Sequence, residues 1–205
     1  MDSPDHARGD RPRAFRSSSE IRFRTSSRPE HNRSMIRLAT DSDLRILPDI
    51  ERAAGTLFEP IGMSSVAEHE PVPVDTLRVY QQAGRAWVWG GDGPIGYLLV
   101  SALDASAHID QVSVRPEWAG RRIGKQLIDR AVCWAAEEGM PAVTLTTFTE
   151  VPWNGPYYAR LGFRYLSDAE QTPGLCAVRA AERARGLDRW PRACMRAELA
   201  EWALG

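Results

Sequence analysis

The chain has 205 residues and a formal net charge of −1, because 26 Lys and Arg residues face 27 Asp and Glu residues. This length suits one globular domain with a tail. The near-neutral charge argues against a dedicated nucleic-acid-binding protein, whose basic face raises the total. No run approaches the roughly 18 apolar residues that a membrane span requires, so we expect no transmembrane helix and no membrane partner.

Three cysteines, Cys133, Cys176 and Cys194, lie far apart, with no C-x-x-C pair and no histidine at the spacing of metal ligands. A sparse, odd set of this kind is typical of reduced thiols in a cytoplasmic protein. We therefore expect a cytoplasmic protein without a metal site.

Residues 1–34 differ from the rest of the chain. They hold eight Arg and five Asp and Glu residues, with clustered Ser and few apolar side chains. No helical or strand periodicity is visible in them, which predicts a disordered N-terminal extension. Residues 35–205 carry a net charge of −4 and are expected to form a single domain.

From Met35 onward the apolar pattern predicts alternating elements. The expected strands cover 36–39, 86–89, 95–103, 109–114, 143–148, 163–166 and 193–199. A helix that Asp41 or Asp43 caps should follow the first strand, and further helices should cover 123–138, 157–161 and 174–185. Residues 58–76, with three prolines, should form a broken connection or a short helix. Because helices and hairpin strands are mixed, the fold class is α/β of the mixed α+β kind.

The strongest motif is the segment 108–125, HIDQVSVRPEWAGRRIGK, in which a strand runs through a short turn into an amphipathic helix. The first amides of a helix have no partners inside it, and the helix dipole favours an anion there. Gly120 and Gly124 would let a phosphate approach the backbone, and Arg121, Arg122 and Lys125 add positive charge. A P-loop is excluded because Lys125 is followed by glutamine, and the Rossmann glycine pattern is incomplete.

This segment resembles the acetyl-CoA-binding motif of the GCN5-related N-acetyltransferases, Q/R-x-x-G-x-G/A. Ala119, Arg122 and Gly124 occupy its three marked positions. Arg122 replaces a glycine, which is compatible with the motif if its backbone is helical. A second block, WNGPYYARLGF over 153–163, resembles the N…Y-x-x-x-G-F block of the same family, with Tyr158 four residues before the Gly-Phe pair.

The resemblance implies a central mixed, mostly antiparallel sheet, splayed at its middle strands and flanked by helices. It implies direct acetyl transfer from acetyl-CoA to an amine within a ternary complex, without a metal. Tyr158 would protonate the departing thiolate, and Asp110, His108 or a water would take the proton of the amine. The residues implied to bind the cofactor lie on the strand, turn and helix start and in the second block: Val112, Ser113, Val114, Gly120, Arg121, Arg122, Ile123, Gly124, Lys125 and Asn154.

The acceptor stays open at this point. We favour the amine of a small molecule, with a protein N-terminus or a lysine side chain as the alternative. A third alternative is a CoA-binding sensor without turnover, which the departures at Ala119 and Arg122 motivate. A homodimer is a further expectation carried by the resemblance.

Overall fold

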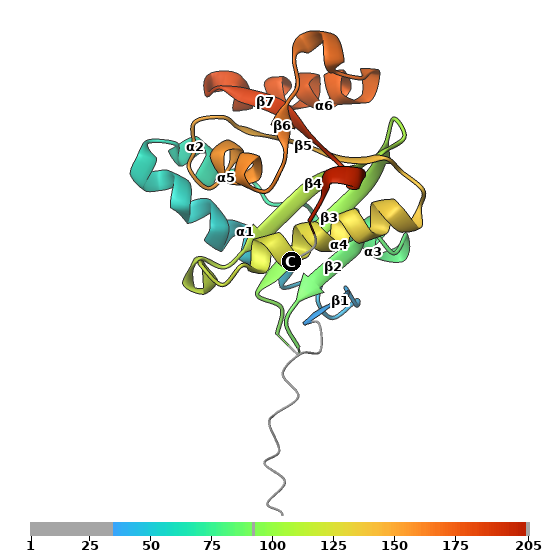
Figure 1. The fold of residues 1–205 in the computed structure, drawn as a ribbon. Coiled ribbons are helices and arrows are strands. Elements are labelled where there is room, and N and C mark those ends of the chain that lie inside the picture. Colours follow the sequence, from blue (N-terminus) through green and yellow to red (C-terminus); the bar gives the residue numbers. More distant parts are fainter. Residues whose placement is uncertain (1–34, 92, 204–205) are drawn as a thin grey trace, which may run out of the picture. The chain divides into compact units, whose positions relative to one another are not determined.

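The computed structural model describes residues 35–91 and 93–203, so the disorder expected for residues 1–34 concerns a segment outside these ranges (Figure 1). Seven strands in the described part form one sheet in the order β1-β2-β3-β4-β5-β7-β6. Neighbouring strands are antiparallel except for β4 and β5, which are parallel. The strands are β1 (Ile36–Leu38), β2 (Ala86–Trp89), β3 (Gly96–Leu103), β4 (Ser106–Val114), β5 (Ala142–Phe148), β6 (Arg164–Tyr165) and β7 (Arg192–Glu198).

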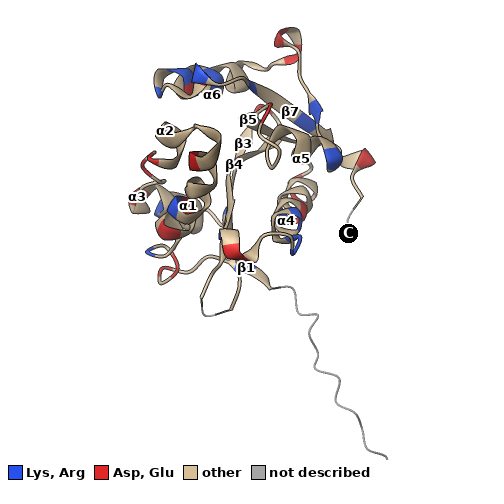
Figure 2. Cartoon of the chain, turned by 90° about the vertical axis from the view of Figure 1, so that its left-hand side faces the viewer, with Lys and Arg blue, Asp and Glu red and all other residues tan. Residues whose placement is uncertain are grey.

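Helices cover both faces of this sheet (Figure 2). They are α1 (Leu47–Gly55), the 3-10 helix η1 (Thr56–Ile61), α2 (Ser64–Ala67), α3 (Val74–Gln82), α4 (Ile123–Glu137), α5 (Gly155–Arg160) and α6 (Pro173–Ala184). Alternate strand residues serve opposite faces. On β3, Leu99 therefore packs in the core beneath α1 and α3, whereas Leu98 packs in the core beneath α4. The expected mixed, mostly antiparallel sheet flanked by helices is confirmed.

Three details of local structure differ from what the sequence predicts. Residues 58–76 were expected to form a broken connection or a short helix, and they contain most of the short helix η1 and all of α2, but α3 begins at their end and continues to Gln82, where no helix was expected. Asp43 does not cap α1, whose N-cap residue is Ile46. The Asp43 carboxylate instead accepts hydrogen bonds from the Arg37 guanidinium (2.6 Å) and from the Thr40 amide (2.7 Å). The last helix also begins slightly earlier than expected, at Pro173.

The feature of the sheet that matters for function is the separation of its two middle strands. Strands β4 and β5 pair only where Ala107, His108 and Ile109 face residues 143–145. At Asp110 the register against β3 shifts, because Leu99 pairs with Gln111 and Val100 pairs with Ile109. Such a bulge bends a strand and increases its twist. Beyond the bulge β4 stays with β3 and β5 stays with β7, which opens a gap inside the sheet.

Candidate active site

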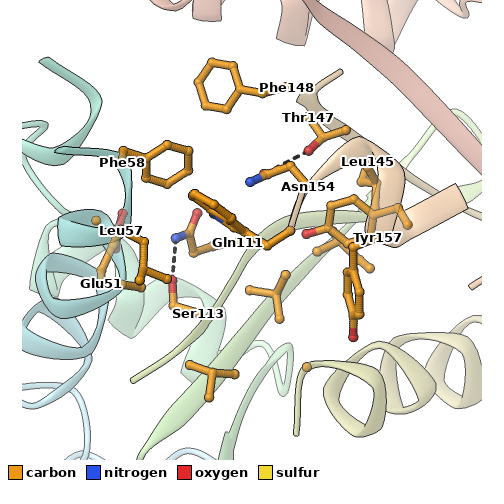
Figure 3. Close-up of a pocket in the computed structure, with 18 of the residues that line it drawn as sticks. Glu51, Leu57, Phe58, Gln111, Ser113, Leu145, Thr147, Phe148, Asn154 and Tyr157 are labelled. Carbon is orange, nitrogen blue, oxygen red and sulfur yellow. Dashed lines mark hydrogen bonds between the residues drawn. The ribbon is translucent and has the colours of Figure 1, made fainter. Parts of the chain in front are cut away.

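A cavity of about 620 Å³ occupies this gap. Consecutive residues 109–115 of β4 and the following turn all line it. Since consecutive strand residues point to opposite faces, the cavity passes through the sheet from the α4 side to the α1 side. On the α1 side, the Gln111 side chain lies centrally between residues of α1 and of the β5–α5 region (Figure 3), and its Nε2 donates to Ser113 Oγ (2.9 Å).

The turn before α4 supplies the end of the cavity on the α4 side. Gly120 has φ +77° and Arg122, the N-cap residue of α4, has φ +59°. The backbone of Arg122 is therefore left-handed, so the condition of a helical backbone, under which an arginine was taken as compatible with the motif, is not met. The chain needs a residue with a left-handed backbone immediately before α4, and the family motif has a glycine at this position, which Arg122 occupies. An L-residue adopts that conformation at a cost of roughly 1–2 kcal/mol.

The next marked position leaves little room for a side chain. A Cβ added to Gly124 would lie 3.3 Å from the Tyr157 hydroxyl, so the first turn of α4 and the side of α5 meet closely. The amides of this first helical turn face a cavity rather than a preceding turn of helix. Together with the helix dipole, they form a site that can bind the phosphates of a nucleotide-type ligand.

The basic side chains of this turn have different surroundings. The Arg121 guanidinium stacks over the Trp118 ring, 4.5 Å from its centroid, and Arg121 does not line the cavity. Lys125 is buried, and its ammonium is held by Asp129 (2.7 Å) and by the carbonyl of Ala203 (3.1 Å). At Lys125, the group best placed to meet a ligand is therefore the backbone amide. The other candidate cofactor residues, from Val112 to Gly124 and Asn154, line the cavity.

Helix α5 brings the second sequence block to the same cavity. Asn154 is its N-cap residue, and Asn154 Oδ1 accepts a hydrogen bond from Thr147 Oγ1 of β5 (3.0 Å). This bond turns the amide nitrogen of Asn154 into the cavity (Figure 3). Helix α5 has only six residues, which explains why Asn154 lies a single turn before Tyr158.

Tyr158 lines the cavity and is fixed by aromatic neighbours. Its ring packs edge-on against Tyr157 and Phe163, at centroid distances of 5.6 and 5.8 Å. Burial raises the pKa of the Tyr158 hydroxyl above its usual value, with a further contribution from Tyr157. The phenol is therefore protonated at neutral pH and has a proton to give.

The structure distinguishes the two candidate bases by their position. His108 is buried, and its Nδ1 lies 3.0 Å from Thr144 Oγ1. Burial lowers the pKa of His108 to about 4. Asp110, on the bulge, lines the cavity and is hydrogen-bonded to Ser101 and Tyr80. Desolvation raises the pKa of Asp110, although these hydrogen bonds and Arg85 oppose that effect.

Sequence reasoning missed two carboxylates that line the cavity, Glu51 on α1 and Glu182 on α6. Glu51 Oε2 accepts hydrogen bonds from Tyr97 Oη and from the Val72 amide. Glu182 is buried among Thr146, Arg179 and Arg192. Neither residue lies in a motif, and only the tertiary fold brings them to β4.

Gly155, the first residue of α5, lets that helix pack on the end of β5. An added Cβ would lie 3.0 Å from the Phe148 carbonyl oxygen and 3.1 Å from Thr149 Cα, and it would collide with the Tyr165 hydroxyl. We expect Gly155→Ala to lower the free energy of unfolding by about 1–3 kcal/mol, the usual cost of overpacking. Urea titration measures this effect. Gly91→Ala, where a Cβ meets nothing within 4 Å, is the control and should leave the midpoint unchanged.

Two further observations bear on the class of site. In residues 35–91 and 93–203, no group of three or more His, Cys, Asp or Glu side chains is arranged to hold a metal ion. Among the helices that the structure describes, none is long and apolar enough to cross a membrane.

The sheet with its splayed middle strands, the amides at the start of α4 and the cavity between them define an acyltransferase fold. The model of the acetyltransferase (GNAT) family matches residues 50–163, more than half of the chain. The chain belongs to this family and is an acetyltransferase.

Similar solved structures carry the same fold. The PaiA N-acetyltransferase from Thermoplasma acidophilum, solved with coenzyme A, has 15% identity and a TM-score of 0.60, over 80% of this chain and 97% of that one. The N-acetylglutamate synthase from Neisseria gonorrhoeae, solved with coenzyme A and N-acetyl-glutamate, has 18% identity and a TM-score of 0.58, over 80% of this chain and 34% of that one. The ribosomal-protein-S18-alanine N-acetyltransferase from Escherichia coli has 14% identity and a TM-score of 0.55, over 83% and 95%.

Proposed function

We propose that residues 35–205 act as a single domain that moves an acetyl group directly from acetyl-CoA to the amine of a small molecule. The observation that carries this proposal is the cavity through the sheet. One end has the unpaired amides of α4, the middle has Tyr158, and the other end opens between α1 and α6. An anionic donor and an amine acceptor can thus reach the same point from opposite faces.

Residues at the start of α4 and on both sides of the gap fit acetyl-CoA. The amides of Ile123, Gly124 and Lys125 would receive phosphate oxygens, with Arg122 beside them. The free edge of β4 at Val112, Ser113 and Val114 would bind the pantetheine arm, and Asn154 would bind it from the other side. When bound, this co-substrate supplies an acetyl group already activated as a thioester.

The chain's own part in the reaction is to position the partners and to move protons. A backbone N–H of β4 near Val112 or Ser113 would stabilise negative charge on the carbonyl oxygen. Tyr158 would donate its phenolic proton to the leaving sulfur. Asp110 would accept the proton of the amine, directly or through water, since it lines the cavity and His108 does not.

The choice of a small amine rests on the shape of the acceptor end. Proteins with a similar fold act on different acceptors, as the names of the N-acetylglutamate synthase and of the ribosomal-protein-S18-alanine N-acetyltransferase show. The fold alone therefore does not decide which acceptor is used. Here the acceptor end is a walled cavity, which suits a compact ligand. We also place its action in the cytoplasm, since Cys133, Cys176 and Cys194 are all free thiols.

Calorimetric titration of the full chain with acetyl-CoA tests the cofactor site. We expect Gly124→Glu to weaken binding about tenfold or more, because the new side chain adds negative charge beside the phosphate site and crowds Tyr157. Gly91→Glu, on the open β2–β3 turn, is the matched control and should bind as the parent does. Equal affinity of the Gly124 variant and the parent would contradict this placement of the cofactor.

A further inference from the structure

The acceptor end of the cavity has a wall of three aromatic rings from separate parts of the chain. Phe58 comes from η1, Phe148 ends β5 and Trp153 precedes α5. The Phe58 ring lies 5.7 Å from each of the other two rings, edge-on at 63° and 64°. All three residues line the cavity, and Phe58 and Phe148 stand above Gln111 in Figure 3. We call this set the aromatic wall.

Side chains on the far side of the aromatic wall fix the position of Phe148. Phe148 packs edge-on against Trp190 at 6.3 Å, and the Arg192 guanidinium lies 4.3 Å from the centroid of the Phe148 ring. Phe148 is buried, whereas Trp153 is 37% exposed at the rim. The wall is therefore a supported surface that a flat ligand can reach from the solvent side.

A fixed carboxylate stands at the same end. Both hydrogen bonds to Glu51, from Tyr97 Oη and the Val72 amide, go to Oε2, which leaves Oε1 for a ligand. These two donors are neutral groups, so the charge of Glu51 is not cancelled by them. Two other acidic residues line the cavity: Glu182 is paired with Arg179 and Arg192, and Asp110 is hydrogen-bonded to Ser101 and Tyr80.

Two of the cations at this end have anionic partners, because Arg52 pairs with Asp49 (2.7 Å) and Arg192 pairs with Glu182. Arg185 Nε donates to the neutral His69 Nε2 (3.0 Å), so Arg185 keeps its charge, but this residue is exposed to solvent, which screens it. The local chemistry is thus an apolar flat surface beside a carboxylate that is free to attract a cation.

We propose that the acceptor is a primary amine joined by a short linker to a flat apolar body and lacking a carboxylate. This inference rests on the proposed function. The body packs against the aromatic wall, where offset or edge-on ring contacts add to the burial of apolar surface. Glu51 attracts the ammonium form and holds it at the α1 side of Gln111, beside the gap between β4 and β5. A carboxylate next to the amine would be repelled by Glu51.

The first test compares acceptors by release of CoA from acetyl-CoA with the full chain. We expect kcat/KM for 2-phenylethylamine to exceed that for ethylamine roughly 100-fold, in line with the selectivity that apolar pockets achieve. Phenylalanine amide should be acetylated at least about tenfold better than phenylalanine, which differs from it in having the carboxylate.

The second test uses variants. Trp153→Ala and Phe58→Leu should raise KM for 2-phenylethylamine about tenfold and leave that for ethylamine unchanged. Val79→Ala, an exposed apolar residue on α3 outside the cavity, is their control. Glu51→Gln should raise KM for the amine and abolish its dependence on salt, whereas the exposed Glu68→Gln should do neither.

The outcomes separate this inference from the proposed function. If acetyl-CoA binds but ethylamine or phenylalanine is acetylated as efficiently as 2-phenylethylamine, the acceptor class is wrong and the proposed function stands. If an N-terminal peptide is acetylated as efficiently as 2-phenylethylamine, both the acceptor class and the choice of a small-molecule amine are wrong, and only the acetyl transfer stands. If the variants of the aromatic wall raise KM for 2-phenylethylamine and for ethylamine equally, the aromatic wall does not select the acceptor. If acetyl-CoA does not bind at all, the proposed function fails, and this inference fails with it.

Discussion

Replacing Tyr158 with Phe should lower kcat about 100-fold or more while leaving KM for acetyl-CoA within about a factor of two. The ring contacts with Tyr157 and Phe163 do not need the hydroxyl, so the variant should keep its fold and its cavity. What the variant would lose is the proton that we propose Tyr158 gives to the departing sulfur. Because burial raises the pKa of this phenol, the proton is present across the neutral range, and the loss should be similar from pH 6 to pH 9.

Steady-state kinetics with saturating amine measures this effect, and Tyr157→Phe is the control. Tyr157 neighbours Tyr158 on α5, but its hydroxyl lies against Gly124 at the cofactor end. Removing the Tyr157 hydroxyl should therefore lower the affinity for acetyl-CoA more than it lowers kcat. Equal kcat in the Tyr158 variant and the parent would remove Tyr158 from the chemistry.

The parts of the fold that the sequence predicts well are those whose signals are contiguous. The strand, turn and helix of 108–125 hold their apolar period, their proline and their glycines within one short run. The block around Tyr158 is equally local. Helix α4 was accordingly placed almost to the residue, and Gly139 follows it with φ +69° as a C-terminal glycine should.

The elements that escaped prediction are decided by neighbours distant in the chain. Helix α3 has a short apolar period, Val74, Leu77 and Tyr80, but only Leu77 is fully buried. Pro73 was taken as a breaker although it precedes the first turn of this helix. Strand β7 is paired on both sides, by β5 and by β6, and no local pattern in residues 193–199 reveals either partner.

The same reasoning explains the site residues that were missed. The bulge at Asp110 is one extra residue inside a strand of alternating apolar and polar residues, and no glycine or proline marks it. Glu51 and Glu182 are single charges on amphipathic helices, a pattern that normally indicates a solvated face. Their place in the cavity follows from packing on a sheet that is built from residues 35 to 198. Local sequence thus predicts the residues at the α4 end of the cavity, whereas the residues at the acceptor end are brought together only by the tertiary fold.

Replacing Glu182 with Gln should lower the free energy of unfolding at pH 7 by about 3 kcal/mol, because it leaves a buried arginine without its counter-charge. The side chains of Glu182 and Arg192 are only 11% and 9% exposed, and Arg179 is 13% exposed. Arg179 keeps Asp188 as a partner, so Arg192 is the residue left unpaired.

The same carboxylate should make stability depend on pH. Burial alone would raise the pKa of Glu182, but Arg192, Thr146 and Arg179 hold it below its usual value. A carboxyl group with a lowered pKa in the folded state stabilises the protein above its unfolded pKa of about 4.3, and this contribution is lost as the pH falls toward the folded value. The parent should therefore lose more stability than Glu182→Gln between about pH 5 and pH 3.

Urea titrations at pH 7, 5 and 3 measure both effects, with Glu137→Gln as the control. Glu137 also pairs with an arginine, Arg130, but its side chain is 57% exposed, so its removal should change little. A Glu182 variant as stable as the parent at pH 7 would show that the buried pairs contribute nothing net. Because Arg192 also covers the Phe148 ring, a destabilised variant should in addition bind the acceptor less well, which links the ion pairs of α6 to the acceptor end of the cavity.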